Sequence, residues 1–299
     1  MKNTFIGAPM ERREDLRFLR GRGEYVDDLK LEGLLYAVIL RSPVAHGRIT
    51  SLVTSAALKC PGVHAVVTAK DMPGDVPIIP MRLQPLPEFK PYEQPVLAHD
   101  KVRYVGEPIA VVLAESIAFG EDALEAIGLV IDPLPAISDC ASAAQRRSLL
   151  FEASGTNCSL VFHAHKGDAD TAFRDAPFTR RECFSTGRHY GLTLEPRGVM
   201  AQWDREKQRL TIFGAAKVPF FNRRILAKQI VLPETAIDMI ENDVGGGYGA
   251  RGEFYPEDFL IPFAARHSER PVKWTEDRRE NLMAMNHARE ASADIEIAK

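Results

Sequence analysis

Short apolar runs in the first half of the chain predict buried strands that alternate with a helix. Residues 34–40, 62–68 and 109–114 combine apolar and β-branched side chains over strand-like lengths. Ser116 follows the last of these runs and is expected to cap a helix with one apolar face. Residues 129–131 predict a further strand. Together these segments predict an α+β fold.

Two stretches interrupt this pattern and suggest how the chain divides. Residues 72–95 contain seven prolines, too many for a strand or a helix, and predict a long irregular loop. Residues 139–148 are small and polar, which is typical of a boundary between domains. We therefore expect a solvated lead-in at residues 1–14, a first domain at 15–140 and a second domain at 150–299.

The second half repeats the mixture of strands and helices. Residues 199–204 and 210–214 predict a hairpin joined by a charged turn. Pro219 begins a helix whose apolar side chains recur at helical spacing. The remaining expected elements are strands at residues 180–185, 235–244, 272–274 and 294–297 and helices at 256–266 and from Arg278 to about Arg289.

A glycine-rich stretch between a predicted strand and a predicted helix is the strongest candidate for a binding site. Residues 244–253 read Val-Gly-Gly-Gly-Tyr-Gly-Ala-Arg-Gly-Glu, with five glycines in eight positions. Glycine lets the backbone turn tightly and approach a ligand closely, and a glycine loop before a helix often presents N–H groups to an anion. A surface turn is the alternative, but a turn requires fewer glycines.

The same stretch contains the dinucleotide-binding pattern G-x-G-x-x-G at Gly247, Gly249 and Gly252. That pattern normally follows a buried apolar strand, whereas residues 237–243 alternate and are acidic. Pro262 also lies inside the following helix, where it removes a hydrogen bond. We therefore favour a loop for another ligand over a nucleotide site.

Composition excludes several classes of function. The chain has 299 residues, 45% hydrophobic and 26% charged, with a net charge of −3, as in an ordinary globular protein without an electrostatic preference for nucleic acid. No apolar run is long enough for a membrane span, and the N-terminus does not resemble a signal peptide. The sequence predicts a cytoplasmic protein.

Cysteines and histidines give little support for a metal centre bound by side chains. The four cysteines include no C-x-x-C pair, so we expect free thiols in a reducing compartment and no iron–sulfur or zinc site in this chain. His163 and His165 would face the same way on a strand, but no acidic or cysteine partner lies at ligand spacing. We interpret them as surface histidines and assign no metal ligand.

Several stretches resemble one protein family, in order along nearly the whole chain. The resemblance is to the molybdopterin-binding large subunit of the xanthine dehydrogenase, aldehyde oxidase and carbon monoxide dehydrogenase family. The stretches that carry it are residues 21–28, 41–49 and 102–110, Glu195-Pro196-Arg197, and residues 244–253 and 270–280.

This resemblance implies a hammerhead α/β domain at residues 15–140, followed by the first part of a molybdenum-cofactor-binding α+β domain at 150–299. It implies a molybdenum hydroxylase that oxidises an aldehyde, an N-heterocycle or a similar small substrate with oxygen from water. Electrons would pass to partner subunits that carry iron–sulfur clusters and FAD, which agrees with the absence of cysteine pairs here.

Some site residues can be carried over by position. Gly247, Tyr248 and Gly249, next to Gly246, match the family's Gly-Phe-Gly beside the molybdenum, with tyrosine in place of phenylalanine. The phenol could form a hydrogen bond or turn into the packing. Lys217 occupies a position that often carries glutamine near the metal, and it could instead turn outward.

Two residues resemble the family's substrate contacts less closely. Glu253 lies one position after the place where xanthine-specific members carry a substrate-facing acid, which is Gly252 here. Arg289 matches a substrate-orienting arginine only across a gap. The substrate therefore stays open.

The family's general-base glutamate and most of its pterin-binding residues belong to a more C-terminal region than this chain contains, so no catalytic residue is assigned. We expect this chain to be one component of a molybdenum hydroxylase, completed by another chain and inactive by itself. A truncated fragment, or an assembly or binding module that keeps the fold, is the alternative. A third and weaker hypothesis is a nucleotide-binding protein that uses Gly247, Gly249 and Gly252.

Overall fold

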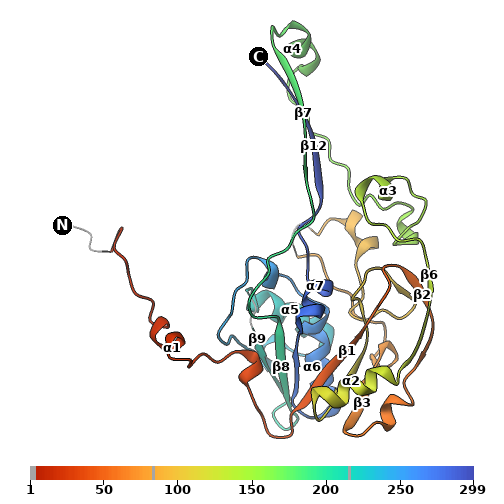
Figure 1. The fold of residues 1–299 in the computed structure, drawn as a ribbon, viewed down its shortest axis with the longest axis vertical. Coiled ribbons are helices and arrows are strands. Elements are labelled where there is room, and N and C mark those ends of the chain that lie inside the picture. Colours follow the sequence, from red (N-terminus) through yellow and green to blue (C-terminus); the bar gives the residue numbers. More distant parts are fainter. Residues whose placement is uncertain (1–4, 83–84, 215–216) are drawn as a thin grey trace.

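A seven-stranded sheet runs through the body of the molecule. The computed structural model describes residues 5–82, 85–214 and 217–299, and Figure 1 shows its ribbon. The strand order of the sheet is β10-β9-β8-β11-β1-β5-β3. These strands are β1 (Leu35–Arg41), β3 (Val63–Val67), β5 (Pro108–Ala114), β8 (Gly198–Asp204), β9 (Arg209–Gly214), β10 (Ile237–Ile240) and β11 (Val272–Thr275). The strands expected in these regions are confirmed, as is the α+β class.

Both halves of the chain contribute to this one sheet. Strand β1 pairs with β5 from the first half and, on its other edge, runs parallel to β11 from the second half. The polar stretch at residues 139–148 carries the short helix α3 (Cys140–Ala144) and leaves the sheet uninterrupted. The two regions expected as separate domains therefore share backbone hydrogen bonds.

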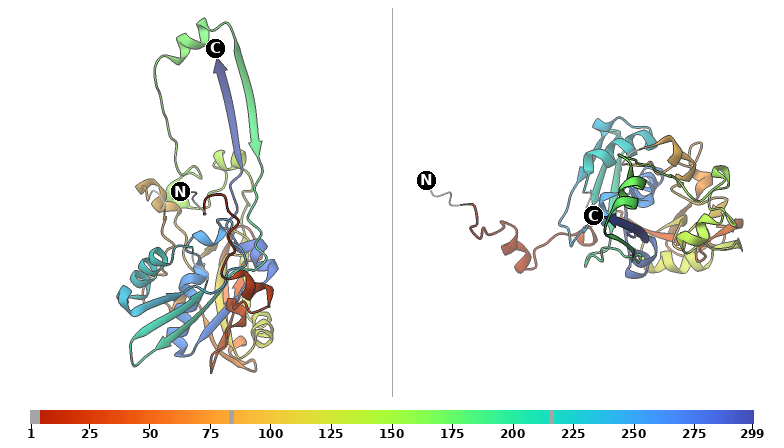
Figure 2. Two further views of the ribbon diagram at one scale, coloured as in Figure 1. Left: turned by 90° about the vertical axis from the view of Figure 1, so that its left-hand side faces the viewer. Right: turned by 90° about the horizontal axis from the view of Figure 1, so that it is seen from above.

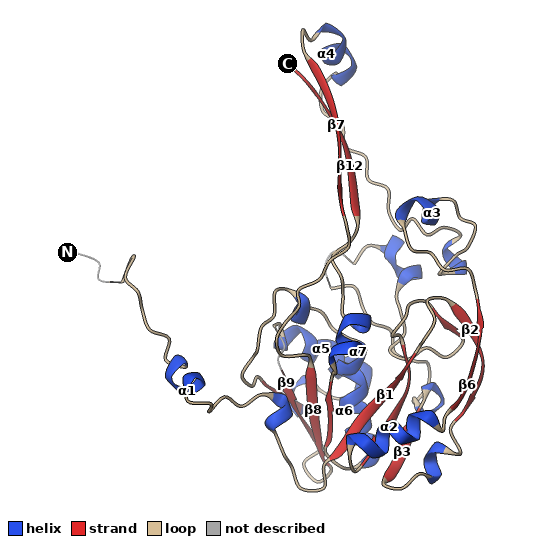
Figure 3. Ribbon diagram, in the orientation of Figure 1, coloured by secondary structure: helices blue, strands red, loops and turns tan. Residues whose placement is uncertain are grey.

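Alternate residues of β5 pack against different layers because successive side chains in a strand point to opposite faces. Val111 and Leu113 belong to the main core, which includes helices α5 (Pro219–Ile230) and α6 (Pro256–Ser268). Val112 and its even-numbered neighbours pack instead with helix α2 (Ile117–Glu125). Figure 3 shows the helices and strands in these positions.

A second, three-stranded sheet has the order β4-β2-β6 and covers part of the first half. Its strands are β4 (Lys101–Val102), β2 (Gly47–Val53) and β6 (Gly128–Pro133). Strand β2 was not predicted from the sequence, because its polar and half-exposed positions give no apolar run. The side chain of Ser116 caps α2 as expected, by accepting a hydrogen bond from the Phe119 amide.

Two predicted elements are shorter in the structure. The strand expected at residues 235–244 ends at Ile240, because Asp243 binds the Arg17 guanidinium and the Glu24 amide and leaves the sheet edge. The helix expected to reach Arg289 is α7 (Arg278–Ala284). It ends there because Met285 is buried in an extended conformation and Ala288 pairs with His189.

The proline-rich loop also departs from expectation. Residues Pro87–Tyr92 form a 3-10 helix, whose first position tolerates proline because that N–H has no partner in a helix. Three short pieces of the chain lie outside the described residues. They are positions 83–84 of this loop, positions 1–4 of the expected lead-in, and positions 215–216, just before Lys217. The described part of the lead-in leads to the short helix α1 (Asp15–Leu19).

A two-stranded ribbon projects from the body, and helix α4 (Ala169–Asp175) lies at its far end (Figure 2). Strands β7 (Thr179–Thr186) and β12 (Ala291–Ala298) pair along their full length and are exposed at nearly every position. His163 and His165 are exposed in an irregular segment before α4, and not on a strand. In the described part of the chain, no helix has the length and apolar character needed to cross a membrane.

Candidate functional site

The glycine loop joins β10 to α6 and needs glycine at two positions. Gly246 and Gly249 have φ angles of +111° and +90°, which side chains other than glycine rarely adopt. Tyr248 also has a positive φ, of +47°, and its side chain is 79% exposed. The ring therefore does not turn into the core, and its hydroxyl has no hydrogen-bond partner among the described residues.

Several backbone carbonyls of this loop have hydrogen-bond partners, whereas several of its backbone amides have none among the described residues. The carbonyls of Gly246, Gly247 and Gly249 accept hydrogen bonds from Arg251, the Ala250 amide and the Gly252 amide. By contrast, the amides of residues 246–249 donate to no group that the structure describes. A Cβ atom placed on Gly247 or Gly249 would meet nothing within 4 Å. At Gly247 and Gly249 the loop therefore has free N–H groups beside open space, an arrangement suited to an anionic or oxygen-rich ligand.

Lys217 lies at this open side. It lines a cavity of about 370 Å³ together with Gly247, Tyr248 and Gly249. Its backbone amide donates to the Arg251 carbonyl, and its methylene chain passes over Gly252. The structure thus brings Lys217 to the glycine loop, with the side chain exposed toward the cavity.

A larger cavity of about 720 Å³ lies on the other side of Tyr248 and Gly249. Glu253 and Arg289 both line it, so the two substrate candidates and two of the cofactor candidates meet around one space. Gly246 lines neither cavity and lies at the base of the loop, near Thr193.

Several residues of the larger cavity were not identified from the sequence. Arg82, in the proline-rich loop, forms an ion pair with Glu253, with 3.1 Å between Nη2 and Oε1. Tyr190 and His287 stack with ring centroids 5.1 Å apart. No local pattern marks these residues, because each comes from a distant part of the chain. His189 and Tyr92 complete the polar and aromatic wall.

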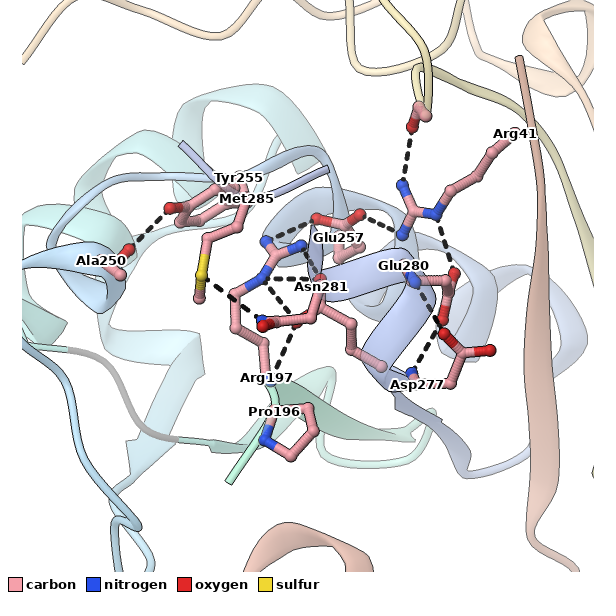
Figure 4. Close-up of polar contacts among 12 residues, drawn as sticks. Arg41, Pro196, Arg197, Ala250, Tyr255, Glu257, Asp277, Glu280, Asn281 and Met285 are labelled. Atoms are coloured by element: carbon pink, nitrogen blue, oxygen red, sulfur yellow. Dashed lines mark hydrogen bonds and ion pairs between the residues drawn. The ribbon is translucent and has the colours of Figure 1, made fainter. Parts of the chain in front are cut away.

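A buried ion network lies beneath the loop (Figure 4). Glu257 of α6 accepts a hydrogen bond from Arg41 of β1 on one oxygen, at 2.7 Å, and from Arg197 on the other, at 3.1 Å. Arg197 also binds Glu276, and Arg41 also binds Glu280. All five side chains are buried or nearly so.

This network connects the first half of the chain to the site. The Arg197 guanidinium lies over the ring of Tyr255, 4.0 Å from its centroid, and the Tyr255 hydroxyl donates to the Ala250 carbonyl in the loop. Burial alone would raise the pKa of Glu257, but Arg197 and Arg41 hold it down to about 2. Glu257 is therefore ionised at neutral pH and compensates both guanidinium groups.

The loop does not form a dinucleotide site of the usual kind. Gly252 belongs to a 3-10 turn, and three residues separate it from Pro256, where α6 begins. Among the described residues, no group of three or more histidine, cysteine or acidic side chains could hold a metal ion.

Comparison with known proteins supports the family resemblance. Residues 20–135 match the aldehyde oxidase and xanthine dehydrogenase a/b hammerhead domain, and residues 151–299 match the molybdopterin cofactor-binding domain. The nicotine 6-hydroxylase large subunit of Paenarthrobacter nicotinovorans is 36% identical over 294 residues, which cover 98% of this chain and 36% of that protein.

Two further relatives agree. The carbon monoxide dehydrogenase large chain of Hydrogenophaga pseudoflava is 34% identical, over 96% of this chain and 37% of that one. The crystal structure of quinoline 2-oxidoreductase from Pseudomonas putida 86 matches with a TM-score of 0.87 and 32% identity, over 98% of this chain and 37% of that one. The chain spans little more than a third of these relatives, and it belongs to the xanthine dehydrogenase and aldehyde oxidase family of molybdopterin-binding large subunits.

Proposed function

We propose that this chain forms the hammerhead domain and the first part of the cofactor domain of a molybdenum hydroxylase. The enzyme would oxidise an aldehyde, an N-heterocycle or a similar small substrate, with water as the source of oxygen. The observation that carries the proposal is that the amides of residues 246–249 donate to no described group, while Gly247 and Gly249 lie beside open space and line the cavities. Relatives named as hydroxylases and dehydrogenases support the same chemistry.

The molybdopterin cofactor would be held on this chain by Gly246, Gly247, Tyr248 and Gly249, with Lys217 nearby. When bound, it supplies the redox chemistry for hydroxylation. The amides would bind its electronegative atoms without an intervening side chain. Lys217 would add a positive charge at the edge of the smaller cavity. Glu253, paired with Arg82, and Arg289 would orient the substrate in the larger cavity.

Further polypeptide is expected to complete the enzyme. Relatives such as the nicotine 6-hydroxylase large subunit are more than twice as long as this chain, and another is named as the gamma subunit of a dehydrogenase complex. The ribbon of β7 and β12 leaves Phe184, Ile295 and Ile297 exposed, and an isolated two-stranded ribbon is only marginally stable. We propose that polypeptide equivalent to the relatives' remaining length covers it, and that partner subunits carry iron–sulfur clusters and FAD.

The proposal also implies that the 299-residue chain by itself is inactive and retains little molybdenum, because no general base is assigned within it. The competing hypothesis of a non-catalytic assembly module predicts that even the complete complex contains no molybdenum. Metal analysis of protein purified with its genomic neighbours separates the two.

Gly247→Ala tests the loop within that complex. Gly247 does not have a positive φ, and its added methyl group meets nothing within 4 Å, so the variant should fold normally. The methyl group would nevertheless occupy the space in which the cofactor is proposed to lie. We expect molybdenum content and turnover to fall together while the urea midpoint stays unchanged.

Gly187→Ala is the matched control. Gly187 also lacks a positive φ and has nothing within 4 Å of an added Cβ, but it lies outside the loop and does not line either cavity. It should keep full molybdenum content and turnover. Full activity in Gly247→Ala as well would exclude the assignment of this loop to the cofactor.

A further inference from the structure

A buried arginine, Arg251, and a largely buried glutamate, Glu195, bind the backbone of the glycine loop. The Arg251 side chain is about 5% exposed, and it reaches back to the start of its own loop. Its Nε donates to the Gly246 carbonyl at 2.8 Å. Its Nη2 lies within 3.0 Å of the Glu195 carbonyl, the Pro196 carbonyl and the Glu195 carboxylate.

Glu195 binds the residue that precedes Gly246 in the loop, Gly245. Its carboxylate accepts a hydrogen bond from the Gly245 amide at 2.7 Å, and its own amide donates to the Gly245 carbonyl at 3.2 Å. The two backbones are so close that a Cβ on Gly245 would lie 2.4 Å from the Glu195 Cβ. Gly245 and Gly246 are thus bound to Glu195 and Arg251, whereas Gly247 and Gly249 lie against open space.

These contacts determine which way the amides point. In a trans peptide the C=O and the following N–H point in opposite directions. Arg251 holds the Gly246 carbonyl, so the Gly247 N–H, which belongs to the same peptide, must point away from the Arg251 guanidinium. In the same way, the bond from the Glu195 amide to the Gly245 carbonyl directs the Gly246 N–H away from Glu195.

We propose that Arg251, fixed by Glu195, is a positioning residue, and that the two side chains together orient the free amides of Gly246 and Gly247 for the cofactor. The inference rests on the proposed function, since it concerns the same loop. It assigns to Arg251 no contact with cofactor or substrate. The four short contacts of one buried guanidinium, three of them to carbonyls, leave the arginine no freedom to act elsewhere.

The test uses Arg251→Met in the complete complex. Methionine keeps much of the packing but cannot hold the Gly246 carbonyl, so the loop should sample other conformations. We expect faster hydrogen exchange in the peptide that spans residues 245–249. We also expect a loss of about tenfold or more in affinity for the cofactor, the scale found when a residue that supports a metal site is removed, measured as lower molybdenum occupancy. Arg251→Lys keeps the charge beside Glu195 and should recover part of the occupancy.

Arg266→Met is the control for loss of a buried arginine–carbonyl bond. Arg266 donates to the Ile230 carbonyl at 2.7 Å and lies over the Trp203 ring, away from the loop. This variant should lose stability without a change in loop exchange or in molybdenum occupancy per folded complex. If Arg251→Met does not fold, Arg251→Lys decides the question.

Unchanged exchange and full molybdenum occupancy in a folded Arg251 variant would overturn the inference. That result is distinct from failure of the proposed function, in which the wild-type complex itself would contain no molybdenum. Molybdenum in the wild-type complex, lost in Arg251→Met and partly restored in Arg251→Lys, supports both.

Discussion

Glu257→Gln should destabilise the fold more than any comparable glutamate substitution on the surface. Each carboxylate oxygen of Glu257 accepts a hydrogen bond from one arginine, Arg41 or Arg197, and the side chain is 2% exposed. Glutamine has the same shape but replaces one oxygen by an NH2 group, which would face a guanidinium donor. Two buried cations would then lose their shared counter-charge.

The magnitude follows from the pKa of Glu257. The two arginines hold that pKa at about 2, compared with an ordinary value of 4.5, against the effect of burial. At about 1.4 kcal/mol for each pKa unit, ionised Glu257 contributes about 3 kcal/mol to the free energy of unfolding. Breaking a buried ion pair by removing one partner typically costs about 3–5 kcal/mol, so we expect a loss in that range at pH 7.

The pH dependence gives a second check. Because the folded-state pKa lies below the unfolded-state value, this stabilisation is complete above pH 4.5 and is lost as the pH falls from about 4.5 to about 2. The stability difference between wild type and Glu257→Gln should therefore shrink across that interval. Urea unfolding followed by far-UV circular dichroism at a series of pH values measures it.

Glu269→Gln provides the control. Glu269 pairs with Arg205 at 2.9 Å, but both side chains are more than half exposed, and exposed pairs contribute about 1 kcal/mol or less. An equal, small loss in both variants would refute the argument that the Glu257 network supports the fold. So would a large loss in Glu257→Gln that persists unchanged at pH 2.

Two further predictions concern other charged groups. Glu107 is 1% exposed, and burial raises its pKa to about 7. The contribution of Glu107 to the free energy of unfolding is therefore greatest below pH 4.5 and is lost as the pH rises to about 7, a loss of up to about 3 kcal/mol. This pH-dependent loss should disappear from the urea unfolding curves of Glu107→Gln. Lys217 is exposed beside the glycine loop. Lys217→Gln in the complete complex should therefore change the pH–rate profile, while the free energy of unfolding stays within about 0.5 kcal/mol of wild type. An unchanged pH–rate profile would mean that Lys217 does not take part in the site.

Elements with a strong local signal were predictable from the sequence. The apolar run that forms β5, the hairpin of β8 and β9 and the helix that begins at Pro256 each follow from side-chain periodicity and from proline at a helix start. The glycine loop was also identified, because five glycines within eight positions exceed what a surface turn requires. Strand β2 was missed because its polar positions resemble those of a loop.

The cavities could not be predicted, because their walls come from distant parts of the chain. Arg82 and Glu253 are separated by 171 positions, and Arg41 and Glu257 by 216. Neither pair shows any local spacing that distinguishes it from ordinary surface charges. The sheet that joins the two halves of the chain could not be predicted either, because the parallel pairing of β1 with β11 depends on tertiary packing.

The side chains that bind the glycine loop support a stretch whose proposed binding groups belong to the backbone. Glycines let amides reach a ligand, but they also give a chain segment more conformational freedom than any other residue does. A binding site made of amides needs that freedom removed, because donors act strongly only when they are already oriented. Here Arg251, Glu195 and Tyr255 bind backbone groups of the loop. Substitution of these three residues should therefore affect the proposed site more than substitution of Tyr248, whose side chain is exposed.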